Sequence, residues 1–305
     1  MEKLFSLRLR SCFHKIDNVW DQIQEVRLRS GRPLILVMNS CEKMLDISGN
    51  LCDQNGQVLK VQFEDIQESL AYICQYSLYA FEDELRRGFI TVRGGHRVGI
   101  AGQISLENGK IKSIAHVSSL NIRVAHAVKG CGLNVLPLLW EEKRPCHTLI
   151  VSPPGGGKTT LLRDLVRLFS DGTVDHPGIS VGVDDERSEV AACYLGVPQN
   201  DVGIRTDVLD HCPKAMGIEL LVRSMAPKLI AFDELGDEKD VKAMHYAIHS
   251  GCSVLTTLHG DRTEDIRYRC GTLEFERYIF LNCGEKGQRI CRVMNSEGKT
   301  LFKAG

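Results

Sequence analysis

Residues 147–164 read HTLIVSPPGGGKTTLLRD, and this stretch decides the fold. A short apolar run, Leu149 to Val151, precedes a turn rich in proline and glycine, and a run with leucines at helical spacing follows. This order predicts a strand, a phosphate-binding loop and a helix. Glycines let backbone N–H groups turn inward around phosphate oxygens, and the helix N-terminus adds positive potential behind them. The stretch therefore predicts a nucleotide site.

The loop departs from the motif G-x-x-x-x-G-K-[ST] at one position, where Ser152 stands in place of the first glycine. Lys158 is expected to reach the β and γ phosphates, and the hydroxyl of Thr159 to ligate Mg²⁺. The residues expected to bind the nucleotide are Ser152, Pro153, Pro154, Gly155, Gly156, Gly157, Lys158, Thr159 and Thr160. The alternative is a glycine-rich turn that binds nothing, and the strand-loop-helix context disfavours it.

Three short apolar runs downstream predict further strands of the same sheet. The runs are Ile179 to Val183, Leu229 to Phe232 and Ser253 to Thr257. In a parallel sheet that helices cover on both faces, the strands are buried on both sides and form continuous apolar runs of this kind. The predicted fold class is therefore α/β. In such sheets the ligand lies beyond the carboxyl ends of the strands. The polar residues at these ends are Lys158, Asp185, Glu186, Asp233, Glu234 and His259.

The stretch KLIAFDE carries two consecutive carboxylates to this edge. Asp233 is expected to hold Mg²⁺, and Glu234 to polarise or deprotonate the attacking water. A simple kinase or switch GTPase does not need the second carboxylate, so the pair favours an ATP hydrolase. The alternative is a strand capped by solvated acids. In TTLHG, Thr257 or His259 is placed to sense the γ-phosphate, unless His259 is only hydrogen-bonded at a strand end.

Two arginines are candidates to reach a nucleotide across a subunit interface, where such a group stabilises transition-state charge. Arg205 lies in residues 201–217, which read as a long polar loop, and Arg223 lies on the helix before KLIAFDE. An intrachain ion pair is the open alternative for each. In DDERSE, Asp185 or Glu186 is expected to position water or metal, and Arg187 to pair locally with Glu189 or Asp184.

The N-terminal region, residues 1–130, predicts a smaller α+β domain in front of the nucleotide-binding domain, residues 131–305. Strands are expected in EVRLRSGRPLILVMN and in GFITVRGGHRVGIAGQISLENGKIKSI. Helices are expected from about Glu64 and over Tyr76 to Arg87, and the tail is expected to begin with a helix near residue 264 and end in strands. The basic residues Arg86, Arg87, Arg93, His96 and Arg97 form either a solvated face or a group that reaches a phosphate.

Composition excludes several classes of protein. The 305 residues carry a net charge of -1, which gives no global electrostatic case for binding nucleic acid or an anionic membrane. The 12 cysteines form no C-x-x-C pair, which disfavours a zinc site and fits reduced thiols in a cytosolic protein. No apolar run approaches the ~18 residues that a transmembrane segment needs.

Taken together, the motifs resemble the family of stage III sporulation protein AA. The stretches that carry the resemblance run in order from about residue 25 to residue 260: EVRLRSGRPL, GFITVRGGHRVGIAGQ, NIRVAHAVKG, PPGGGKTTLLRD, DDERSE, PQNDVGIRTDVLDHCPKAMG, LVRSMAPKLIAFDELG and TTLHG. The stretch PQNDVGIRTDVLD is far more specific than the phosphate loop. Ser152 is the main departure, because members of the family usually carry glycine there.

The family is similar to the ATPases of type II and type IV secretion systems. The resemblance implies a RecA-like P-loop NTPase core that uses ATP and Mg²⁺, and a homo-hexamer with ATP near the subunit boundaries. It implies a cytoplasmic protein, peripheral on the mother-cell side of the forespore membrane, with membrane-embedded sporulation channel components as partners. His259 matches a histidine box of the secretion ATPases, whereas Arg93, Arg97 and Arg123 match their N-terminal arginines only loosely.

Three functions compete at this stage. The first is an ATPase that energises assembly of, or transport through, the mother cell–forespore channel during endospore formation. The second is a nucleic-acid-associated P-loop ATPase, against which the net charge and the lack of an aromatic-basic groove count. The third is a scaffold that uses ATP only to assemble, against which Asp233 and Glu234 count.

Overall fold

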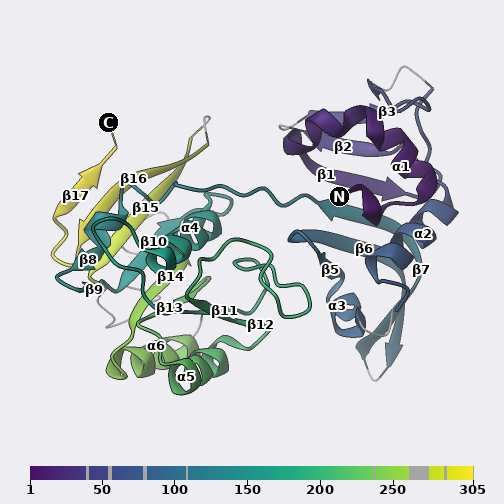
Figure 1. Ribbon diagram of the computed structural model, residues 1–305. Helices are drawn as coiled ribbons and strands as arrows, with labels where there is room; N and C mark the ends of the chain where they lie inside the picture. The colour runs from purple at the N-terminus through teal and green to yellow at the C-terminus, as the bar shows by residue number, and fades with distance from the viewer. Residues whose placement is uncertain are drawn as a thin grey trace. The chain divides into compact units, whose positions relative to one another are not determined.

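The computed structural model describes residues 1–38, 41–53, 57–77, 81–107, 109–236, 238–260, 275–284 and 287–304 (Figure 1). The chain divides into two compact units, Met1–His126 and Ala127–Gly305. The sequence predicts the boundary after residue 130, a few residues further along the chain.

The N-terminal unit is built on a seven-stranded antiparallel sheet with the order β4-β3-β2-β1-β7-β6-β5. In β1, Val26 and Leu28 are fully buried while Arg27 and Arg29 lie on the other face, so the predicted alternation is confirmed. The strands are β1 (Ile23–Arg29), β2 (Ile35–Met38), β3 (Cys41–Leu45), β4 (Leu51–Cys52), β5 (Phe89–Val92), β6 (His96–Glu107) and β7 (Lys110–Arg123).

Short helices accompany this sheet. They are η1 (Glu2–Leu4), α1 (Leu7–Phe13), η2 (His14–Gln22), α2 (Phe63–Ile73) and α3 (Glu82–Arg87). The helix expected over Tyr76 to Arg87 is wrong at its start. Gln75 and Tyr76 have φ of 49° and 61°, a left-handed conformation that ends α2 and cannot begin a helix. Gly88, with φ of 82°, ends α3 as predicted.

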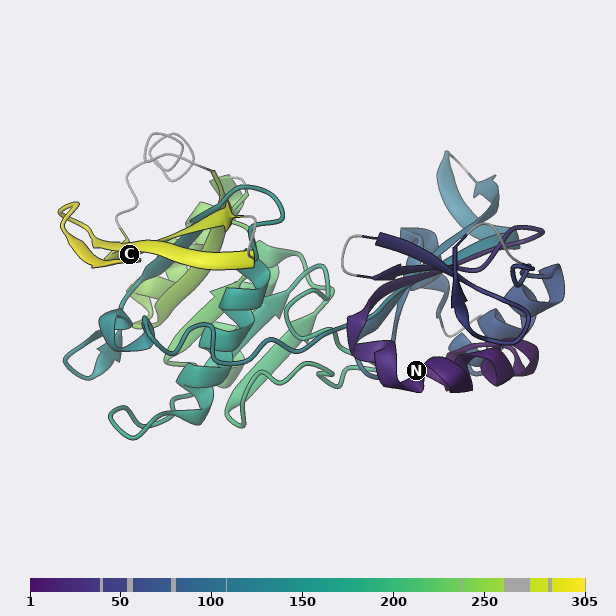
Figure 2. The ribbon, with the colours of Figure 1, turned by 90° about the horizontal axis from the view of Figure 1, so that it is seen from above.

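The C-terminal unit contains an eight-stranded sheet with the order β12-β11-β13-β14-β10-β15-β16-β17. In this spatial order, each strand from β12 through to β15 pairs in parallel with its neighbour. The strands β16 and β17, coloured yellow in Figure 2, continue the sheet at one edge in antiparallel pairing. The strands are β10 (Thr148–Ser152), β11 (Val181–Asp185), β12 (Thr206–Asp210), β13 (Leu229–Phe232), β14 (Ser253–His259), β15 (Arg277–Gly284), β16 (Gly287–Asn295) and β17 (Thr300–Lys303).

Helices bury both faces of this sheet, as a parallel sheet requires. The helix α4 (Lys158–Asp171) packs Leu161 and Leu165 against one face. The helices α5 (Lys214–Met225) and α6 (Glu238–His249) pack Ile218 and Met244 against the other (Figure 1). The short helix η4 (Leu136–Leu139) and the two-stranded sheet of β8 (Trp140–Glu141) and β9 (Arg144–Pro145) precede β10.

The structure corrects two sequence predictions in this unit. The strand expected at Ile179 to Val183 lies two residues later, so Asp184 and Asp185 belong to β11 itself. The stretch 201–217 is not one long loop, because it contains β12 and the start of α5. The helix expected near residue 264 lies outside the described residues. No helix among the residues described is long and apolar enough to cross a bilayer.

Asp184 is a buried carboxyl on the face of β11 that meets α5. It is 1% exposed, and neither of its carboxylate oxygens has a hydrogen-bond partner among the described residues. The helix approaches it through Gly217, where a Cβ would lie 2.1 Å from Oδ1. Burial, and then the charge of Glu186, raise the pKa of Asp184 to about 8. The neutral acid is therefore the form that fits this site at physiological pH.

We expect the substitution Asp184→Asn to flatten the dependence of stability on pH. In the unfolded chain this carboxyl ionises near pH 4, whereas in the folded protein it ionises at about pH 8. Between these values the folded state holds a proton that the unfolded state has lost, so stability falls as pH rises, by up to ~1.4 kcal/mol per pH unit. Above pH 8 the loss is complete.

Thermal unfolding midpoints at pH 6 and pH 9 measure the effect. The wild type should lose more stability between these values than Asp184→Asn does. The exposed Asp175 provides the control, because Asp175→Asn should behave as the wild type. Parallel behaviour of the wild type and Asp184→Asn would contradict a buried neutral acid.

Candidate active site

The phosphate loop connects β10 to α4 through residues 153–157. Gly155 and Gly157 have φ of 75° and 83°, a left-handed conformation that favours glycine at both positions. The helix begins directly at Lys158, and the N–H groups of its first turn have no partners within the helix. Such a turn, with the helix dipole behind it, is a binding site for phosphate. The loop therefore has the conformation that the sequence predicts.

Ser152 is accommodated at the end of β10 and constrains the loop. It is 1% exposed, and its hydroxyl donates to the carbonyl of Pro153 over 3.1 Å. The hydroxyl lies where a side chain at position 156 would point, since a Cβ on Gly156 would be 1.7 Å from Ser152 Oγ. Position 156 thus needs a glycine because the serine hydroxyl leaves no room for a side chain, and not because of its own backbone angles.

Lys158 and His259 meet across the site. The lysine Nζ lies 2.8 Å from His259 Nδ1 and 3.4 Å from the carbonyl oxygen of Ser152. The parallel pairing of β10 with β14 causes this contact, because Ser152 and His259 are register partners at the ends of the two strands. His259 therefore contacts the expected phosphate-binding lysine directly.

Asp233 binds two hydroxyl groups. Its Oδ2 accepts from Thr159 Oγ1 over 2.5 Å, and its Oδ1 accepts from Thr257 Oγ1 over 2.6 Å. Hydroxyl and carboxylate oxygens form the donor set that Mg²⁺ prefers. The Thr159 hydroxyl and the Asp233 carboxylate are thus groups that could hold a Mg²⁺ ion.

Glu234 follows in an unusual backbone conformation, with φ of 56°. Its N–H donates to Thr257 Oγ1 over 2.9 Å. Its side chain is 34% exposed, with Oε1 lying 3.8 Å from His259 Nε2 and Oε2 lying 3.5 Å from Arg187. Arg187 thus forms an ion pair with Glu234 at this edge of the sheet.

A cavity of about 140 Å³ lies beside these groups. Asp233 and Glu234 line it together with Lys214 and Gly236. The sequence prediction missed Lys214, whose Nζ lies 2.7 Å from the carbonyl oxygen of Glu234. From the sequence, the stretch HCPKAMG, which contains this lysine, is assigned to a loop, and so the lysine is not placed at the site. The helical spacing that follows in KAMGIELL is the signal that places it at a helix start.

Asp185 and Glu186 both line the cavity, but their carboxylates make different contacts. The Asp185 carboxylate accepts from the N–H groups of Glu189, Val190 and Ala191, with the shortest distances of 2.8 Å to Glu189 and Ala191. Its lone pairs are used to close the turn after β11, so it is a poor ligand for water or metal. Glu186 instead faces the site through an ion pair of 3.6 Å with Lys214.

The two candidate arginines lie away from this edge. Arg205 precedes the first residue of β12 and donates to the carbonyl of Ser170, near the end of α4. Since α4 begins at Lys158 and rises ~1.5 Å per residue, these ends are roughly 20 Å apart. Arg223 lies near the end of α5, where it contacts Glu219 and Tyr246. Neither arginine joins Lys158 in its own subunit.

Of the N-terminal basic residues, His96, Arg97 and Arg123 lie on the antiparallel sheet, whereas Arg86 and Arg87 lie on α3. Arg97 and Arg123 are register partners on β6 and β7. Arg97 stacks over Phe89 at 4.0 Å, and Arg123 lies 3.4 Å from Glu25. Burial lowers the pKa of His96 to about 4, and its Nδ1 accepts from the N–H of Ala125. His96 is therefore neutral and adds no charge to this surface.

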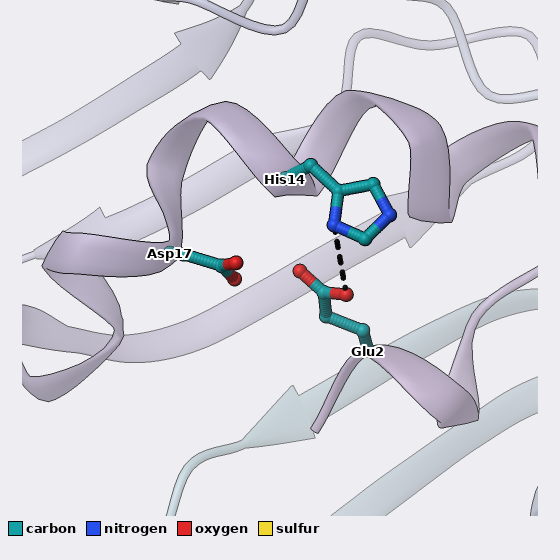
Figure 3. Close-up of side chains that lie close together, drawn as sticks. All are labelled: Glu2, His14 and Asp17. Atoms are coloured by element: carbon teal, nitrogen blue, oxygen red, sulfur yellow. Dashed lines mark ion pairs between the residues drawn. The ribbon is translucent and has the colours of Figure 1, made fainter.

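A separate group of potential metal ligands lies near the N-terminus (Figure 3). Glu2 and His14 form an ion pair of 3.4 Å, with Asp17 beside them. His14 is 68% exposed, and the contact is that of a surface ion pair. We assign no metal to it.

The chain is similar to known proteins over most of its length. The profile of the family described as "Sporulation stage III, protein AA" matches residues 1–301. Stage III sporulation protein AA of Bacillus subtilis (strain 168) is 38% identical over 290 residues, covering 93% of this chain and 90% of that protein.

Two solved structures are similar in fold. The ATPase DotB of Yersinia pseudotuberculosis has a TM-score of 0.60 at 14% identity, covering 96% of this chain and 81% of its own. The pilus retraction motor PilT, solved with bound ADP, has a TM-score of 0.60 at 14% identity, covering 96% of this chain and 83% of its own. These similarities confirm the predicted RecA-like P-loop core. The match over nearly the whole sequence places the chain in the family of sporulation stage III protein AA.

Proposed function

We propose that the protein is a Mg²⁺-dependent ATP hydrolase. The observation that carries the proposal is the placement of Glu234 in a cavity beside Asp233, which itself contacts the phosphate-loop residue Thr159. A carboxylate next to a metal-binding carboxylate is needed to activate water, whereas nucleotide binding alone does not need it. The likeness to ATPases in fold supports the same conclusion.

Each residue has a separate part in this proposal. The backbone N–H groups of residues 155–160 and Lys158 bind the phosphates. Thr159 and Asp233 hold Mg²⁺, which neutralises charge on the phosphate oxygens. Glu234 accepts a hydrogen bond from the attacking water and draws its proton. His259, between Lys158 and Glu234, senses whether the γ-phosphate is present.

At the level of the cell, we propose that hydrolysis energises assembly of, or transport through, the channel between mother cell and forespore. The protein would act from the mother-cell cytoplasm, as a homo-hexamer bound to membrane-embedded channel components. Membership of the sporulation family supports the process, and likeness to DotB and PilT supports the motor type. Arg205 and Arg223 lie far from their own site, which is compatible with action on a neighbouring subunit.

The substitutions Lys158→Ala and Glu234→Gln should separate binding from turnover. Lys158→Ala removes a charge from the phosphates and should abolish both. Glu234→Gln keeps the shape of the side chain but cannot accept a proton, so ATP affinity should stay within about threefold while hydrolysis falls by at least ~10²-fold. ATP binding by calorimetry and phosphate release measure the two effects.

The exposed Glu238 on α6 provides the matched control, because Glu238→Gln should leave both quantities unchanged. Normal turnover by Glu234→Gln would remove the role assigned to this carboxylate. Stimulation of the wild type many-fold by single-stranded DNA or RNA would favour the nucleic-acid-associated ATPase instead.

A double substitution tests the contact between Ser152 and Gly156. Gly156→Ala should abolish ATP binding, because its Cβ would lie 1.7 Å from Ser152 Oγ. Adding Ser152→Gly removes that oxygen and leaves Pro153 O, at 3.1 Å, as the nearest of the remaining atoms, so the pair should regain binding. Calorimetric titration with ATP measures all four proteins of the cycle.

Gly155→Ala serves as the comparison for this cycle. Position 155 is open but left-handed, with φ of 75°, so the defect there is backbone strain that Ser152→Gly should not relieve. Equal rescue of both alanine variants would show that the serine acts on the loop in general and not on Gly156.

We also expect ATP to favour the ring. Glu234→Gln with ATP and Mg²⁺ should form particles near 204 kDa, the mass of six 34.0 kDa chains. Light scattering at several protein concentrations, with and without ATP, measures this. A monomer under every condition would contradict the hexamer.

A further inference from the structure

We propose that Lys214 is a positioning residue that holds Glu234 in its working conformation, an inference that rests on the proposed function. The starting observation is the backbone of Glu234, with φ of 56°. A residue other than glycine in the left-handed region is strained, and it persists only where its surroundings hold it there. The contacts that hold Glu234 are therefore part of how its carboxylate is aimed.

Both peptide groups of Glu234 are fixed by side chains from other elements. Its N–H donates to Thr257 Oγ1, at 2.9 Å, and Leu235 N–H donates to the carbonyl of Thr257, at 2.8 Å. Its carbonyl oxygen accepts from Lys214 Nζ, at 2.7 Å. Thr257 thus holds the peptide groups on both sides of Glu234, and Lys214 adds a second hydrogen bond to the group that leads away from β13.

Lys214 is itself held in place. Its side chain is 11% exposed, and its Nζ lies 3.3 Å from Asp240 Oδ2 and 3.6 Å from Glu186 Oε2. Asp240 is 8% exposed and also accepts from the N–H of Gly236, at 3.0 Å. One ammonium group thus joins the starts of α5 and α6 to the turn after β13.

The same contacts argue against direct phosphate binding by Lys214. An ammonium group has three N–H donors, and three oxygens already surround this one: the Glu234 carbonyl, Asp240 and Glu186. Two of these oxygens carry negative charge, and they balance the lysine locally. Lys214 therefore acts through Glu234 and not through the nucleotide.

Lys214→Met tests this role, because it keeps the length of the side chain and removes its donors. We expect ATP affinity within about threefold of wild type and a fall of about 10²-fold in kcat, since a misplacement of ~1 Å costs that much at a reacting group. Lys214→Arg should recover much of the rate, because it restores donors at the same position. Lys242→Met, an exposed lysine on α6, should behave as the wild type.

The double variant separates positioning from general damage. If Lys214 acts through Glu234, adding Lys214→Met to Glu234→Gln should not lower the residual rate further. A double variant well below Glu234→Gln alone would overturn the inference, and so would a normal kcat for Lys214→Met.

Absence of ATP hydrolysis by the wild type would reject the proposed function and not the positioning role of Lys214. In that case, crystal structures of the wild type and of Lys214→Met test the positioning role. In Lys214→Met, Glu234 should leave the left-handed region. Retention of φ near 56° in that variant would overturn the role of Lys214 whatever the activity.

Discussion

The hydroxyl of Thr257 is the contact on which the site depends. It donates to Asp233 Oδ1 and accepts from the N–H of Glu234, so one side chain on β14 orients both carboxylates that follow β13. Its position depends on the parallel pairing of β13 with β14, which buries this part of both strands completely. A shift in this pairing would separate the hydroxyl from both groups. The register of the sheet therefore sets the geometry of the site.

The helix α4 connects the phosphate site to a preceding segment of the chain, because it makes contacts at its first turn and at its middle. Its first turn forms the phosphate site. Further along, the buried carboxylate of Asp164 accepts from the N–H groups of Gly130 and Gly132, at 3.0 Å and 2.8 Å, and from Arg167. The segment that enters the C-terminal unit is thus bound to the same rigid helix as the phosphate loop. A displacement of α4 on nucleotide binding would move the phosphate site and this segment together.

The sequence predicts the site residues that stand at the end of an expected strand and whose side chains suit the chemistry. Gly155, Lys158, Asp233 and His259 each follow an apolar run, and parallel pairing brings such ends together without further information. Lys214 could not be found this way, because it lies at a helix start and acts on a backbone carbonyl. The choice between Asp185 and Glu186 could not be made from sequence, because a carboxylate that closes its own turn looks the same there as one that faces a ligand. Such roles depend on local backbone geometry, which residue type does not specify.

Competition for Lys158 links these observations to the proposed mechanism. The lysine is bound to His259 Nδ1, while the other ring nitrogen of His259 lies 3.8 Å from Glu234. A triphosphate that draws Lys158 toward its β and γ oxygens would take the lysine from the histidine, since hydrogen bonds from lysine to phosphate are among the strong, charge-assisted ones. His259 would then keep only its contact with Glu234 among these two residues. In the proposed mechanism, nucleotide binding and the orientation of Glu234 would be coupled through one imidazole ring, which lies at the end of the strand that also carries Thr257.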